Sequence, residues 1–187
     1  MMPMLLPVNQ FDHFYRGGDR IGALRHGPGG PSRPEEWIGS TTARFGLAPQ
    51  GLSVLPDGRL LFEAVDSDPA AWLGPDHVAR YGASTEVLVK LLDLDQRLPV
   101  HMHPNRAFAR THLGLAHGKT EAWYVIDAPE GSEVGVGFKE RMSLDQVSAW
   151  VADRDSDALL GALQTRVVRP GDALLVPAGQ PHTVAAG

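Results

Sequence analysis

Cysteine is absent from the 187-residue chain. The protein therefore has no disulfide bond and no zinc site built from thiolates. Any metal ion must be held by histidine, aspartate or glutamate side chains. Lysine is also scarce: only Lys90, Lys119 and Lys139 occur, whereas arginine is used heavily. A coding bias accounts for this imbalance, and two of the remaining lysines lie in the motifs that suggest a function.

Long apolar runs and blocks of like charge are missing as well. No stretch of 18 apolar residues occurs, so no membrane span is expected. The start, MMPMLLPVNQFDHFY, has too short an apolar run and no basic flank for a secretory signal, so we expect a cytoplasmic protein. With a formal net charge of −5 and no charge block, neither nucleic acid nor a membrane is an expected partner.

The length fits a single domain over residues 1–187. Strand patterns dominate it, and helical patterns occupy the connections. Strands are expected in pairs in 85–104 and 120–138, followed by three more in 164–187. Helices are expected from Asp68 to Tyr81 with a break at Gly74-Pro75, in 105–118, from Ser143 to Val151 and in 157–163, with a loop at 25–34 and a hairpin turn at 55–59. This order favours an all-β barrel or double-sheet fold with helical insertions.

Two histidine motifs suggest a metal site. In RLPVHMHPN, His101 and His103 are two apart, so on a strand their imidazoles point to the same side. In GDALLVPAGQPH, a strand and a Pro-x-Gly turn lead to His182. This G-x5-P-x-G-x2-H spacing matches the second signature of the cupin superfamily, and the H-x-H resembles the first. Glu121, which opens the strand EAWYVID, is the candidate for the carboxylate of the first signature. Three imidazoles and one carboxylate suit Zn²⁺, Fe²⁺, Mn²⁺ or Ni²⁺ and leave coordination positions open.

The segments GKTEAWYVIDA, VLVKLLDLDQRLPVHMHP and RPEEWIGS together resemble the type I mannose-6-phosphate isomerases, a zinc-dependent cupin family. The resemblance runs from about residue 12 to the last residue. It implies a jelly-roll barrel, one divalent metal, most simply Zn²⁺, and the ligands His101, His103, Glu121 and His182. The family lysines near the substrate match Lys90 and Lys119, which we take as the candidate catalytic residues.

The implied reaction interconverts mannose 6-phosphate and fructose 6-phosphate through a cis-enediol. A proton must move from C2 to C1, which requires a base within hydrogen-bond reach. Lys119, Lys90 and a hydroxide on the metal are all candidates, and the sequence does not choose among them.

Several positions depart from the family pattern. Pro99 replaces a serine, His101 a glutamine and Asn105 an aspartate, which keeps the metal but weakens the case for a phosphorylated substrate. Isomerisation of a free aldose, an iron cupin dioxygenase and a non-catalytic sugar-binding module are the alternatives. Only five residues follow His182, so we expect a barrel that lacks its C-terminal strands. We expect the chain to be the N-terminal part of a longer enzyme, and the alternative is that another chain completes the barrel. The exposed edge favours a homo-oligomer.

The other aromatic and imidazole side chains are expected to be structural. His13, His26 and His77 lie outside the motifs and are expected at the surface. His112 and His117 are placed in the inserted helix. Trp123 and Tyr124 are expected to pack rather than react.

Overall fold

The computed structural model describes residues 3–186. The chain groups into two compact units, Met1–Asp95 (unit 1) and Gln96–Gly187 (unit 2). The single domain expected over 1–187 stays a prediction.

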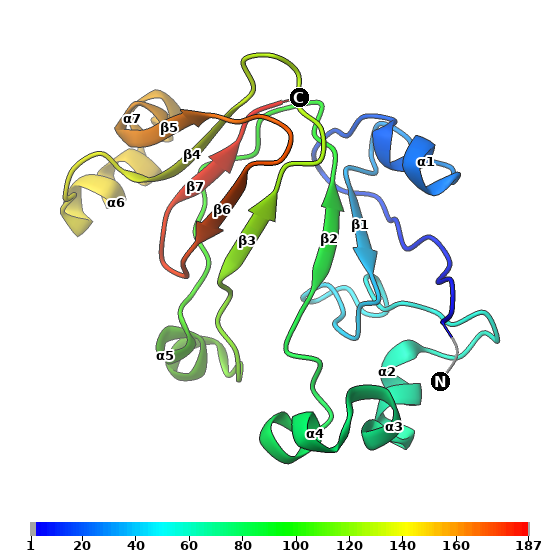
Figure 1. The fold of residues 1–187 in the computed structure, drawn as a ribbon. Helices are drawn as coiled ribbons and strands as arrows, with labels where there is room; N and C mark the ends of the chain where they lie inside the picture. Colours follow the sequence, from blue (N-terminus) through cyan, green and yellow to red (C-terminus); the bar gives the residue numbers. More distant parts are fainter. Residues whose placement is uncertain (1–2, 187) are drawn as a thin grey trace. The chain divides into compact units, whose positions relative to one another are not determined.

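Unit 1 combines a two-stranded antiparallel sheet with short helices (Figure 1). Its elements in chain order are α1 (Arg20–Arg25), β1 (Glu35–Ile38), α2 (Leu61–Ser67), α3 (Pro69–Leu73), α4 (Pro75–Tyr81) and β2 (Val89–Leu92). β1 pairs with β2 so that Trp37 lies opposite Lys90. This register fixes which side chains of the two strands share a face.

Local sequence signals explain the helix boundaries of unit 1. The Asp68 side chain accepts a hydrogen bond from the Ala71 amide, and Pro69 begins α3. Gly74 and Pro75 end α3 and begin α4, and Gly82 ends α4. The predicted break is therefore confirmed. A buried apolar cluster of the unit is built around α2 and consists of Leu55, Leu61, Ala64 and Val65, with Leu6, Trp72 and Leu73 packed against it.

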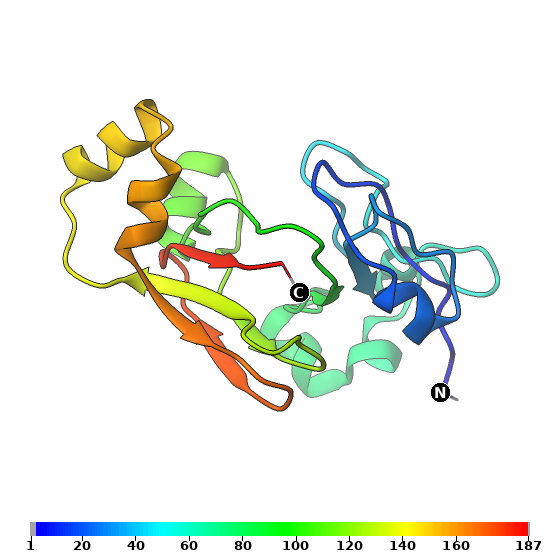
Figure 2. The same cartoon turned by 90° about the horizontal axis from the view of Figure 1, so that it is seen from above.

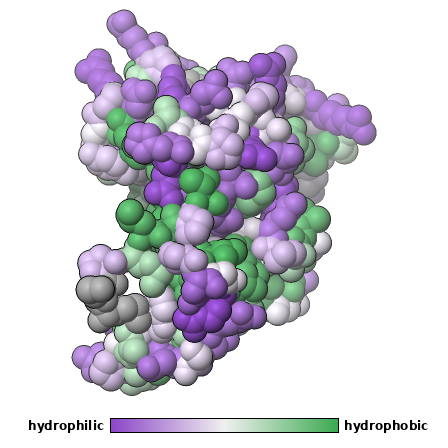
Figure 3. Space-filling view, turned by 90° about the vertical axis from the view of Figure 1, so that its right-hand side faces the viewer, coloured by the Kyte–Doolittle hydropathy of each residue, from purple (hydrophilic) through white to green (hydrophobic). Residues whose placement is uncertain are grey.

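Much apolar surface of unit 1 remains accessible. Figure 3 shows hydrophobic patches between hydrophilic residues on the face turned to the viewer. Leu5, Phe14 and Phe45 are the most exposed of the large apolar side chains in the unit. Single exposed apolar side chains are ordinary in folded proteins and carry no conclusion by themselves.

Unit 2 carries most of the strands. Its elements are α5 (Arg106–Phe108), the π-helical turn η1 (Ala109–Leu113), β3 (Glu121–Tyr124), β4 (Glu133–Phe138), α6 (Leu144–Ala152), α7 (Ser156–Ala162), β5 (Leu163–Val167), β6 (Ala173–Val176) and β7 (His182–Val184). β3 pairs with β6, and β4 lies between β5 and β7, all antiparallel. Helices α6 and α7, yellow and orange in Figure 2, form the connection from β4 to β5.

Most expected elements of unit 2 are confirmed, and two are not. Ser143 caps α6 by accepting from the Gln146 amide, as its motif predicts. The helix expected over 105–118 ends much earlier, because Gly114 takes a left-handed conformation after Leu113. Within the described part of the chain, residues 97–104 form no strand, and their only β-pairing is the isolated bridge between His101 and His182. The prolines there have no N–H to donate to a ladder.

The fold is sheet-rich with helices, and the all-β class is not confirmed. The missing C-terminal strands likewise stay a prediction. Among residues 3–186, no helix has the length and apolar character that crossing a bilayer requires.

Candidate metal centre

His101 and His182 are backbone partners in an isolated antiparallel bridge. The His101 amide donates to the His182 carbonyl at 3.0 Å, and the reverse bond measures 2.8 Å. Side chains of directly opposed residues project to the same side. The two rings accordingly lie with centroids 4.2 Å apart. The His103 ring joins them, with its centroid 5.2 Å from that of His101 and 5.0 Å from that of His182.

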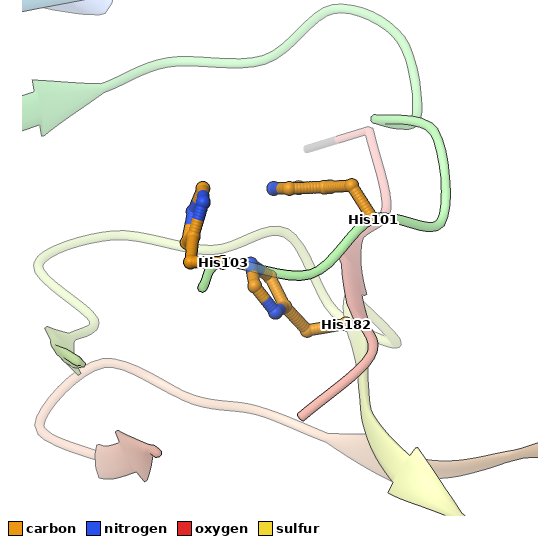
Figure 4. Close-up of side chains that lie close together, drawn as sticks. All are labelled: His101, His103 and His182. Atoms are coloured by element: carbon orange, nitrogen blue, oxygen red, sulfur yellow. The ribbon is translucent and has the colours of Figure 1, made fainter. Parts of the chain in front are cut away.

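The three imidazoles bring ring nitrogens to one point (Figure 4). One nitrogen from each ring lies within 4.8 Å of the other two. Nδ1 of His101 donates to the Pro99 carbonyl and Nδ1 of His182 to the Gln180 carbonyl, both at 2.8 Å. Because a carbonyl only accepts, Nδ1 carries the proton in each ring and Nε2 keeps its lone pair. This is the tautomer that a metal ligand binding through Nε2 requires.

Glu121, the first residue of β3, adds a carboxylate to this cluster. Its Oε1 lies 3.4 Å from His103 Nε2, and its Oε2 lies 3.5 Å from His182 Nε2. The Lys119 ammonium is 2.7 Å from Oε1 and 2.8 Å from His103 Nε2. His103 Nε2 therefore lies next to both the carboxylate and the ammonium. Trp123 Nε1 donates to Glu121 Oε2 at 3.2 Å and orients the carboxylate.

The insertion that separates His103 from Glu121 closes on itself. The Lys119 amide donates to the Pro104 carbonyl at 3.0 Å, so the two ends of the insertion lie next to each other. Gly118 permits this approach, since a Cβ there would lie 2.6 Å from backbone atoms at the start of the insertion. A carboxylate distant in sequence can therefore reach the histidines.

The Pro-x-Gly turn before β7 links two of the histidines. Gly179 adopts a φ of +86°, a left-handed conformation that favours glycine. Its amide donates to the His103 carbonyl at 2.8 Å, and the Gln180 amide donates to the Pro177 carbonyl at 3.1 Å. The turn thus sets the position of His182 relative to His103.

The charge states of the cluster suit a divalent cation. Burial raises the pKa of Glu121, but the hydrogen bonds and charges of His103 and Lys119 outweigh it and hold the pKa far below the usual range. Burial lowers the pKa of His101 and of His182, so both rings are neutral at pH 7. His182 Nε2 is buried without a hydrogen-bond partner in the described residues. An ionised carboxylate and three imidazoles, one with an unsatisfied nitrogen, form a donor set that could hold such an ion.

Known proteins share this chain's sequence pattern. A mannose-6-phosphate isomerase of Streptococcus mutans is 36% identical over 158 residues, which are 82% of the chain and 46% of the relative. The mannose-6-phosphate isomerase ManA of Bacillus subtilis is 35% identical over 101 residues, 54% of the chain and 31% of the relative. Over the residues that it shares with them, this chain is similar in sequence to mannose-6-phosphate isomerases. The chain spans about half the length of the S. mutans relative and about a third of the length of the B. subtilis relative. No family model matches the chain.

Solved structures of the mannose-6-phosphate isomerase family share its fold. The mannose 6-phosphate isomerase of Bacillus subtilis superposes with a TM-score of 0.73 at 25% identity, over 98% of this chain and 56% of that one. A mutant phosphomannose isomerase of Salmonella typhimurium gives a TM-score of 0.69 at 15% identity, over 97% and 65% of the two chains, which bears on the fold alone. The cupin-type fold predicted from the two histidine motifs agrees with these neighbours.

The structure brings together the four residues that the family resemblance predicts as ligands, and Lys119 with them. Lys90, the other predicted catalytic residue, belongs to β2 of unit 1. There its Nζ lies 2.8 Å from Glu35 Oε2. His112 stays outside the cluster and packs on Phe108, with ring centroids 4.4 Å apart.

The sequence did not predict the surroundings of His13 in unit 1 or of Trp123 and Tyr124 in unit 2. His13 was expected at the surface, but its side chain is only 4% exposed and stacks on Phe11 with centroids 4.9 Å apart. That expectation was wrong because the rings of Phe11 and Tyr15 pack next to the His13 imidazole and help to cover it. Trp123 contacts the cluster through Glu121, whereas Tyr124, on the opposite face of β3, is 68% exposed. The alternation along β3 was the available signal for this difference.

Proposed function

We propose that this chain supplies the metal centre of an aldose–ketose isomerase that interconverts mannose 6-phosphate and fructose 6-phosphate through a cis-enediol. The observation that carries the proposal is the convergence of three imidazoles, the Glu121 carboxylate and the Lys119 ammonium on one point. The sequence relatives named mannose-6-phosphate isomerase support the choice of reaction.

His101, His103, Glu121 and His182 are the proposed ligands of one divalent ion, with Zn²⁺ as the first candidate. The ion would act there as a Lewis acid on the sugar carbonyl. The backbone carbonyls of Pro99 and Gln180 keep two of the rings in the binding tautomer. Because those partners are main-chain atoms, the replacement of serine by Pro99 leaves the ring orientation intact.

Lys119 is the proposed catalytic group next to the ligands. Its Nζ lies within 2.8 Å of both a ligand imidazole and the ligand carboxylate. A sugar oxygen or C2 hydrogen held at the centre would therefore be within its reach, as proton transfer requires. Lys90 is proposed as a second substrate-contacting group.

Asn105, which replaces an aspartate of the family pattern, has a structural task here. Its side-chain oxygen accepts from the Phe108 amide at 2.8 Å and caps α5. An amide oxygen caps a helix as well as a carboxylate does. This departure consequently does not weigh against a phosphorylated substrate, which leaves Pro99 and His101 as the departures bearing on that question.

The experiment is isomerisation in D₂O by the Zn²⁺-loaded protein, followed by NMR. We expect fructose 6-phosphate to form from mannose 6-phosphate with deuterium at C1, and chelation to stop the reaction. Unphosphorylated mannose, run in parallel, tests the free-aldose alternative. Full metal loading without turnover of either sugar would contradict the proposal. Oxygen uptake by the iron form would instead favour a dioxygenase, and sugar-phosphate binding without turnover a binding module.

Three further features are proposed with the function. They are a cytoplasmic location, a sugar phosphate as the ligand without nucleic acid or membrane as partner, and assembly into homo-oligomers. Sedimentation of the purified protein tests the last of these.

A further inference from the structure

Pro99 interrupts the pairing between the His101 segment and β7. In a regular antiparallel ladder, hydrogen-bonded pairs recur every two residues along each strand. The pair that follows the His101 bridge would thus be Pro99 and Val184, but a proline has no N–H to donate. The Val184 carbonyl accepts instead from the Leu98 amide at 3.0 Å. Leu98 and Pro99 together therefore oppose one residue of β7, which is the count of a β-bulge.

The Leu98 carbonyl is bound by a side chain of β7. Thr183, which lies between His182 and Val184, donates its hydroxyl to this carbonyl at 2.6 Å. Thr183 is only 5% exposed, and loss of a hydrogen-bond partner in buried surroundings is costly. Both polar main-chain groups of Leu98 are thus attached to β7, the amide through the Val184 carbonyl and the carbonyl through the Thr183 hydroxyl.

The packing of Thr183 fixes the direction of its hydroxyl. Thr183 lies opposite Gly135 of β4 in the sheet. A Cβ at position 135 would lie 3.2 Å from Thr183 Cγ2, so the methyl group lies over the space that glycine leaves open. A β-branched side chain has few χ1 rotamers. With the methyl group next to Gly135 and the hydroxyl on the Leu98 carbonyl, both branches of the side chain are held.

The segment that Thr183 holds also carries the partner of the His101 ring. Nδ1 of His101 donates to the Pro99 carbonyl at 2.8 Å, and Pro99 directly follows Leu98. Proline fixes its own φ and restricts the backbone of the residue before it. A fixed Leu98 carbonyl therefore limits the orientations that are open to the Pro99 carbonyl.

We propose that Thr183 is a positioning residue for the ligand His101, because its hydroxyl holds the bulge that Pro99 creates and so keeps the Pro99 carbonyl in place for the His101 ring. This role rests on the proposed metal centre and assigns a task to a residue outside the ligand set. Pro99 and Thr183 then act as a pair, in which the hydroxyl compensates for the amide hydrogen that proline lacks.

The first test observes the His101 ring in the metal-free protein. Long-range ¹H–¹⁵N NMR spectra distinguish the two neutral imidazole tautomers at a pH well above the ordinary histidine pKa. In Thr183→Val we expect the His101 signals to shift toward the tautomer that carries the proton on Nε2. The His182 ring, whose Nδ1 donates to the Gln180 carbonyl, should stay unchanged and serves as the internal reference. An unchanged His101 tautomer overturns the proposal.

The second test measures Zn²⁺ affinity by chelator competition. We expect Thr183→Val to bind Zn²⁺ about tenfold more weakly than the wild type, because removal of a residue that orients a ligand weakens binding by this order. Thr183→Ser, which keeps the hydroxyl and loses the methyl group, should stay within about threefold of the wild type. If the valine variant does not fold, Thr183→Ala takes its place against Thr183→Ser. Equal losses with and without the hydroxyl would overturn the proposal.

The matched control is Thr165→Val. Thr165 lies opposite Gly135 on the other neighbouring strand, β5, and is exposed. The same substitution there leaves the Leu98 carbonyl and its hydroxyl donor in place. We expect the wild-type Zn²⁺ affinity and the wild-type His101 tautomer. A loss as large as that of Thr183→Val would assign the effect to the sheet around β4 and overturn the proposal.

A double-mutant cycle tests the pairing of Thr183 with Pro99. Pro99→Ala gives position 99 an amide that can donate to the Val184 carbonyl, so the bulge is no longer required. In this background the loss of Zn²⁺ affinity on Thr183→Val should shrink from about tenfold to about threefold or less. The same loss in both backgrounds would overturn the proposal. If the wild type binds no Zn²⁺, the proposed metal centre fails, and the His101 tautomer still decides whether Thr183 positions the ring.

Discussion

His101 and His182 exchange both of their backbone hydrogen bonds across an antiparallel bridge, at 3.0 and 2.8 Å. This pairing directs two imidazoles to one side of the chain and holds their centroids 4.2 Å apart. The geometry depends on main-chain atoms, which the side chains of neighbouring positions do not supply. It therefore explains how a segment containing Pro99 still presents its histidines correctly.

Removal of one ligand should abolish tight metal binding. His103 is the best choice because its side chain is 20% exposed, so truncation leaves the core intact. We expect His103→Ala to weaken Zn²⁺ binding about a hundredfold or more in chelator competition. His112→Ala, which removes a histidine that packs on Phe108, should bind like the wild type. Equal affinities of the two variants would exclude His103 as a ligand.

The Pro-x-Gly turn should matter for metal binding as well as for stability. Gly179 has a φ of +86° and Gly131 a φ of +84°, and a Cβ at either position would meet open space. A valine at either site should cost roughly 1–3 kcal/mol of unfolding free energy through backbone strain. Only Gly179→Val should also weaken metal binding, since the Gly179 amide bonds the His103 carbonyl. Similar metal affinities would show that the turn does not set the ligand geometry.

Lys119 should be needed for turnover and not for the metal. Its ammonium lies 2.8 Å from His103 Nε2 and 2.7 Å from Glu121 Oε1. Because a cation there competes with a metal ion for these atoms, Lys119→Met should bind Zn²⁺ at least as tightly as the wild type. Its kcat should fall by about a hundredfold or more if Lys119 transfers the proton. Lys139→Met is the control, and retention of wild-type kcat by Lys119→Met would remove this residue from the mechanism.

Acid should destabilise unit 1 through Glu35. Its pKa in the folded protein, about 2, is lower than the ordinary 4.5, so the carboxylate contributes stability that is complete above about pH 4.5 and is lost as the pH falls toward 2. That contribution is on the order of 3 kcal/mol. Urea unfolding at a series of pH values should show a smaller acid loss for Glu35→Gln than for the wild type. Glu130→Gln, which removes an exposed carboxylate, should follow the wild type, and parallel curves for all three proteins would refute the assignment.

Local chemistry made part of the fold predictable. The break at Gly74-Pro75 and the cap at Ser143 follow from single residues that dictate their own backbone. The pairing of the strands could not be predicted from local residues in this way. β3 and β4 are neighbours in sequence, yet β3 pairs with β6 and β4 with β5 and β7. Such choices are decided by packing between distant segments, which periodicity along one segment does not record.

The same distinction holds for the candidate site. His101, His103 and His182 could be predicted as one cluster because spacing and a turn motif carry the information. The partner of Lys90 could not, since Glu35 is 55 positions away and meets it only through the register of β1 and β2. The burial of His13 is equally non-local, as it depends on the surrounding rings.

The central claim is that His101, His103, Glu121 and His182 hold one metal ion, and anomalous diffraction at the zinc edge tests it most directly. Crystals of the Zn²⁺-loaded protein should show one strong peak bonded by Nε2 of the three histidines and by the Glu121 carboxylate, at roughly 2.0–2.2 Å. A peak that avoids these four residues, or none at full zinc loading, would contradict the claim.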